Sequence, residues 1–102
     1  MYDYTGGIVL AEAGRDKGGL FCVVGMDRDQ DRLLLADGRR RKASRPKAKK
    51  PGHVRLLTGD GRTFGHPVIE KLKQGQPVSD RELRRALAAF KEGVSLGERR
   101  YD

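Results

Sequence analysis

Short apolar runs separated by turns dominate the first half of the chain. Three runs of four or five residues are apolar and are each closed by glycine or by a charged residue, and a fourth segment alternates apolar and basic side chains. Such runs are typical of β-strands. The sequence therefore predicts strands at Ile8–Ala11, Leu20–Val24, Leu33–Ala36 and Val54–Leu56.

A further strand is predicted by the turn that follows the third run. Asp37-Gly38 favours a two-residue type I′ hairpin, in which both central residues have positive φ. That hairpin would return the chain as a strand over about Arg39–Ala43. Pro46 and Pro51 exclude a regular interior strand or helix from the rest of the segment. Five short strands within about sixty residues predict a mainly β fold, a small five-stranded barrel.

The hydrophobic period changes after residue 58. Gly59–Gly61 is predicted to form a turn between a barrel, residues 1–58, and a helical extension, residues 59–102. Pro67 is suited to the first turn of a helix that runs to about Gln74, and Gly75 then ends it. The C-terminal part is therefore expected to hold one or two short helices.

The second helix has stronger signals. Ser79 and Glu82 have the spacing of a capping box, and Val78 and Leu83 that of a hydrophobic staple. Gly93 stands where a C-terminal glycine is common. The residues at i, i+3, i+4 and i+7, which we call the apolar stripe, are Leu83, Ala86, Leu87 and Phe90. A stripe of this kind needs a surface to cover it, either the barrel or a partner protein.

Charge is concentrated in one segment. The chain has 102 residues, 36% of them hydrophobic and 35% charged, with a net charge of +8 and a pI of about 10.1. Residues 39–57 contain nine basic residues and no acidic ones. Such a balance predicts a polyanionic partner. We call residues 39–53 the basic loop, and its apparent anchoring between strands predicts a shaped binding surface rather than a free tail.

Catalytic and metal-binding patterns are incomplete. Asp27, Asp29 and Asp31 have the opening spacing of a calcium loop, but Arg32 and Gly38 stand where that loop needs glycine and glutamate. The two histidines are far apart, and no serine lies in a nucleophile elbow. We therefore expect a non-enzymatic protein without a metal or another cofactor.

The sequence also bears on location. Cys22 is the only cysteine, it lies in an apolar run, and no disulfide can form within the chain, which is typical of a reducing compartment. The N-terminal residues lack a signal-peptide pattern. No apolar stretch has the length of a membrane span, and no basic amphipathic helix adjoins the basic loop. We expect a cytoplasmic protein that does not bind membranes.

Three motifs in order resemble a known family. They are Ala13-Gly14-Arg15-Asp16-Lys17-Gly18, the Ala36-Asp37-Gly38 turn, and Pro46-Lys47-x-Lys49-Lys50 followed by His53. Over residues 7–57 the chain is similar to the bacterial KOW-domain RNA-binding proteins, relatives of KOW-containing large-subunit ribosomal proteins. The resemblance implies an SH3-like barrel that binds RNA, namely rRNA or the ribosome, in translation. The aromatic content of only 6% favours structured RNA over single strands. Gly19 departs from the pattern, because a basic residue is common at that position.

The resemblance also implies where RNA would bind. Arg15 and Lys17 would lie in an RNA-facing turn, and the basic loop would supply most phosphate contacts. The candidate RNA-binding residues are Arg15, Lys17, Arg39, Arg40, Arg41, Lys42, Arg45, Lys47, Lys49, Lys50 and His53. The alternative is a KOW protein-interaction module that couples transcription and translation and docks a partner through the Leu83–Phe90 face.

Overall fold

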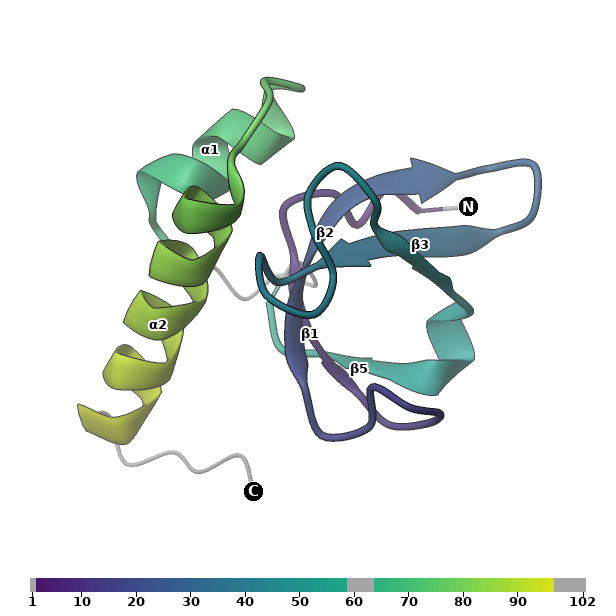
Figure 1. The fold of residues 1–102 in the computed structure, drawn as a ribbon, viewed down its shortest axis with the longest axis horizontal. Helices are drawn as coiled ribbons and strands as arrows, with labels where there is room; N and C mark the ends of the chain where they lie inside the picture. The colour runs from purple at the N-terminus through teal and green to yellow at the C-terminus, as the bar shows by residue number, and fades with distance from the viewer. Residues whose placement is uncertain (1, 59–63, 97–102) are drawn as a thin grey trace.

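The computed structural model describes residues 2–58 and 64–96, and the side chains up to residue 93. A five-stranded antiparallel sheet is followed by two helices (Figure 1). The strands are β1 (Ile8–Ala11), β2 (Leu20–Asp27), β3 (Arg32–Ala36), β4 (Lys47–Lys49) and β5 (Val54–Leu56), and the helices are α1 (Pro67–Lys73) and α2 (Asp80–Leu96). A single 3₁₀ turn, Pro51–His53, joins β4 to β5. The expectation of a small β-rich domain with helices at its C-terminal end is confirmed.

The sheet is open but curved. Its strand order is β4-β3-β2-β1-β5, and among the described residues no pairing joins β4 to β5. A flat sheet of this order would place the two edge strands about 19 Å apart. The chain from Lys49 to Val54 can span at most about 18 Å, and the 3₁₀ turn shortens it further. The sheet must therefore curl so that its two edges approach each other at one end.

Residues on both faces of β1, β2 and β3 are buried, which explains why their apolar runs lack a clean alternation. Ile8 and Cys22 lie on the face that packs against both helices. Val9, Phe21 and Val23 lie on the other face, where the strands pack against one another inside the curl. Apolar residues that are adjacent in sequence therefore belong to different hydrophobic clusters. In addition, the pairing of β2 with β3 shifts register at a bulge between Val23 and Gly25.

Helix α2 covers the sheet with the apolar stripe. Its four members are at most 7% exposed and pack in one cluster with residues of β1, β2 and α1. The capping box is confirmed, because the Glu82 N–H donates to Ser79 Oγ at 3.1 Å and the Ser79 N–H donates to Glu82 Oε1 at 2.9 Å. Val78 is half-buried against the same cluster, as a staple residue should be.

Three expectations from the sequence are wrong in detail. Residues 39–43 form turns rather than a strand, and the fourth strand is Lys47–Lys49 instead. Gly38 has φ +78° but Asp37 does not have positive φ, so the turn is not type I′. Helix α2 continues through Gly93 to Leu96, so Gly93 does not end the helix. The predicted turn at Gly59–Gly61 lies outside the described residues.

Cys22 lies between the sheet and the helices, without exposed surface. Burial, with a smaller effect from the negative charge of Asp37, raises the pKa of its thiol to about 12. Because the thiolate is the reactive form of cysteine, this side chain acts as a small apolar core residue.

Candidate nucleic-acid interface

The basic loop begins with a turn held by one carboxylate. Asp37 Oδ1 accepts hydrogen bonds from the backbone N–H groups of Arg39 and Arg41, both at 2.9 Å. The N–H groups of Asp37 and Gly38 in turn donate to the Arg41 carbonyl oxygen at 2.9 and 3.0 Å. This closed turn fixes the backbone of the three consecutive arginines at the start of the loop.

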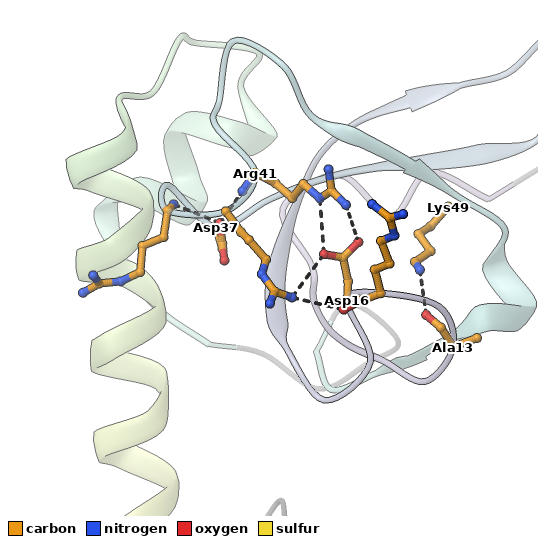
Figure 2. A network of polar contacts seen from close by, with 8 residues as sticks. Ala13, Asp16, Asp37, Arg41 and Lys49 are labelled. Carbon is orange, nitrogen blue, oxygen red and sulfur yellow. Dashed lines mark hydrogen bonds and ion pairs between the residues drawn. The ribbon is translucent and has the colours of Figure 1, made fainter.

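A buried aspartate connects the basic loop to the turn between β1 and β2. Asp16 is 2% exposed, and Figure 2 shows its carboxylate facing the guanidinium of Arg41. Arg41 Nε donates to Asp16 Oδ1 at 3.2 Å and Nη2 donates to Oδ2 at 3.0 Å, which is a bidentate pair. Arg40 Nη1 lies 3.7 Å from Asp16 Oδ1 and donates to the Arg15 carbonyl oxygen at 3.1 Å. Two segments that the sequence separates by 25 positions are thus held together.

A second cation strengthens the same connection from β4. Lys49 is 7% exposed, and its Nζ donates to the Ala13 carbonyl oxygen at 2.7 Å (Figure 2). Burial by itself raises the pKa of Asp16, but the hydrogen bonds and charge of Arg41, with the charges of Lys49 and Arg40, outweigh it and lower that pKa below its usual value. Asp16 therefore stays ionised and holds both loops at neutral pH.

Helix α2 holds the loop from the other side. Asp80 Oδ1 accepts a hydrogen bond from the Ala43 N–H at 2.7 Å. Arg84 Nη1 donates to the Gly38 carbonyl oxygen at 2.7 Å. These contacts from the first turns of α2 mean that the helical extension helps to set the shape of the basic loop.

The structure divides the candidate RNA-binding residues into two groups. Arg41 and Lys49 are engaged inside the chain, and Arg40 is exposed but lies beside Asp16. The other cations are exposed and make no ion pair with a described residue. This second group, which we call the outward cations, comprises Arg15, Lys17, Arg39, Lys42, Arg45, Lys47 and Lys50. His53 is also exposed, in the 3₁₀ turn.

Sequence reasoning missed the acidic and helical residues that shape this surface. In the sequence, Asp16 stands out only as part of a motif, and no pattern indicates Asp80 or Arg84. The position of Asp16 between Arg15 and Lys17 is the one feature of the sequence that could have indicated an ion pair. No local pattern pointed to the other two, because their partners lie 37 and 46 residues away.

We expect the stability of the protein to depend on pH through Asp16. Folding lowers the pKa of the Asp16 carboxyl below 3.8, its value in the unfolded chain. The ionised carboxylate therefore stabilises the native state at pH values above 3.8, and this stabilisation is lost as the pH falls through the pKa of the folded state. Urea unfolding at pH values from 7 to 2.5 should therefore show a smaller acid loss of stability for Asp16→Asn than for the wild type.

Asp29→Asn is the matched control for this measurement. Asp29 is exposed in the turn after β2 and makes no ion pair with a described residue. Its variant should follow the wild-type pH profile. If Asp16→Asn also follows that profile, the Asp16–Arg41 pair does not stabilise the fold.

Within the described residues, no helix is long and apolar enough to cross a membrane. No group of three or more His, Cys, Asp or Glu side chains in that part of the chain is placed to hold a metal ion. No protein-family model and no curated protein matches this sequence.

Proposed function

We propose that this protein is a non-enzymatic RNA-binding module whose curved sheet is an SH3-like barrel of the KOW type. The observation that carries the proposal is the set of seven outward cations, which extend from two loops that Asp16 and Lys49 hold together. A cationic surface held in one shape binds a polyphosphate at a lower entropic cost than a free basic tail does. The cytoplasmic, ribosome-associated setting belongs to this proposal and derives from the KOW resemblance.

Binding would depend mainly on phosphate contacts. Guanidinium groups such as that of Arg39 can contact phosphate oxygens in bidentate fashion, whereas Lys47 and Lys50 act as point charges. Tyr2 is the one exposed large hydrophobic residue in the described part of the chain, and its ring lies 4.8 Å from that of Tyr4. With so few aromatic platforms, recognition by shape and backbone is favoured over base stacking.

The alternative, a protein-docking module, has less support. It requires the Leu83–Phe90 face to be available to a partner, yet the apolar stripe is at most 7% exposed and packs on the chain's own sheet and α1. A partner could reach this face only if α2 left the sheet. RNA binding is the function that the exposed surface supports best.

A salt titration tests the proposal. If six or seven outward cations each neutralise a phosphate, the affinity for an rRNA fragment should fall roughly a thousandfold or more between 50 and 200 mM salt. The measurement is filter binding at several salt concentrations, with the slope of log affinity against log salt as the result. A slope near zero, or no binding at 50 mM salt, would contradict RNA binding through this surface.

A further inference from the structure

The outward face of α2 is basic. Arg81, Arg85 and Lys91 are exposed and Arg84 is half-buried. At 3.6 residues per turn, Arg81 and Arg85 lie opposite the apolar stripe, and Arg84 and Lys91 lie on the flank between the two. Glu92 is the one acidic residue on this face among the described residues. Arg81 and Arg85 make no ion pair with a described residue, so they are available to an external anion.

This face is continuous with the basic loop. Arg84 contacts Gly38, the residue before Arg39, through the 2.7 Å hydrogen bond to its carbonyl oxygen. A Cβ added to Gly38 would lie 2.2 Å from the Asp80 carbonyl oxygen, so the loop backbone rests directly on the first turn of α2. Figure 1 shows the segment that follows β3 lying beside α2. The helix and the loop therefore present their cations in a fixed relative position.

The acidic residues next to this surface are occupied by donors of the chain. Asp80 accepts from the Ala43 N–H, and Asp37 accepts from two N–H groups of its own turn. Glu82 receives Lys71 Nζ at 2.6 Å and the Ser79 N–H. None of these carboxylates pairs with an arginine of the outward α2 face, so that face is complementary to negative charge.

We propose that the outward face of α2 and the basic loop form one continuous phosphate-binding surface, and that its partner is double-helical RNA. This inference rests on the proposed RNA-binding function. Arg81, Arg84 and Arg85 add three cations within about 6 Å along the helix axis, beside the loop. A rigid surface with cations on two adjoining elements suits the regularly placed phosphates of a duplex, which is recognised by shape. Proteins that bind single strands commonly stack the bases on several aromatic rings, whereas the described surface offers only Tyr2 beside Tyr4.

The test compares two variants that each lose two positive charges. Arg81→Gln/Arg85→Gln removes exposed cations of α2 that make no ion pair with a described residue. Arg28→Gln/Lys73→Gln is the control, with one charge from the turn after β2 and one from the end of α1. The probes are an RNA hairpin with a long stem and an unpaired RNA strand of the same composition. Circular dichroism and urea unfolding verify that both variants stay folded.

We expect the α2 variant to bind the hairpin about tenfold to fiftyfold more weakly at 0.1 M salt and to reduce the salt slope by between one and two, because each lost phosphate contact reduces it by about one. The control should leave the slope unchanged.

If the α2 variant matches the control while removal of the outward cations of the basic loop abolishes binding, the inference about α2 is wrong and the proposed function stands. If the unpaired strand binds as tightly as the hairpin, the duplex partner is wrong. If the wild type binds neither RNA, both proposals fail.

Discussion

Replacing Arg39, Lys42, Arg45, Lys47 and Lys50 with glutamine is expected to weaken RNA binding by between about a thousandfold and about ten-thousandfold at 0.1 M salt. All five side chains are exposed and make no ion pair with a described residue. Each phosphate contact contributes about 0.7 to 0.9 to the salt slope, so the slope should decrease by about four. Filter binding across a salt series measures both quantities.

Arg41→Gln provides the contrast for this experiment. Its guanidinium is bound to Asp16 and its side chain is 29% exposed, so its loss should lower the free energy of unfolding and leave the salt slope almost unchanged. The five-residue variant should instead unfold at nearly the wild-type urea concentration. An unchanged RNA affinity in the five-residue variant would refute the basic loop as the binding surface.

Gly38→Ala is expected to destabilise the protein by about 2–5 kcal/mol. Gly38 has φ +78°, where an alanine costs about 1–2 kcal/mol. The added Cβ would also lie 2.2 Å from the Asp80 carbonyl oxygen and 3.0 Å from its carbonyl carbon, so the loop or α2 must move. Urea unfolding gives the free energy, and a domain of this size can lose most of its stability from such a change.

Two other glycines separate the causes of this effect. Gly18 has φ +89° but no atom within 4 Å of an added Cβ, so Gly18→Ala should show the backbone cost alone, about 1–2 kcal/mol. Gly52 has neither positive φ nor a close neighbour, so Gly52→Ala should be nearly neutral. If Gly38→Ala is no more destabilising than Gly18→Ala, the contact between the basic loop and α2 contributes little.

The parts of the fold that depend on local or apolar signals could be predicted from the sequence. The strands β1 and β3 lie within a residue of their expected bounds because burial on both faces made their apolar runs visible. Strand β5 was predictable from its alternation of apolar and basic side chains. The start of α2 was also predictable, since a capping box involves residues only three positions apart. The surface on which α2 packs could not be predicted, because a stripe of apolar residues does not specify what covers it.

The position of the basic loop could be predicted from the sequence, but its structure could not. Strand β4 reads Lys-Ala-Lys and has no hydrophobic pattern, and it forms because β3 offers a free edge to pair with. Sequence reasoning therefore placed the strand several residues too early. It also treated all the cations alike, although Arg41 and Lys49 bind internal acceptors 25 and 36 residues away. Contacts over such separations leave no local trace in one sequence.

The outer side of β4 is an open sheet edge, and its backbone N–H and C=O groups can pair with a strand of another molecule. Three features oppose such an addition. The strand has only three residues, Pro46 and Pro51 flank it without N–H donors, and the exposed Lys47 and Lys50 would repel the same side chains of a second copy. The lysines that we assign to RNA therefore also protect the chain against edge-to-edge aggregation when no RNA is bound.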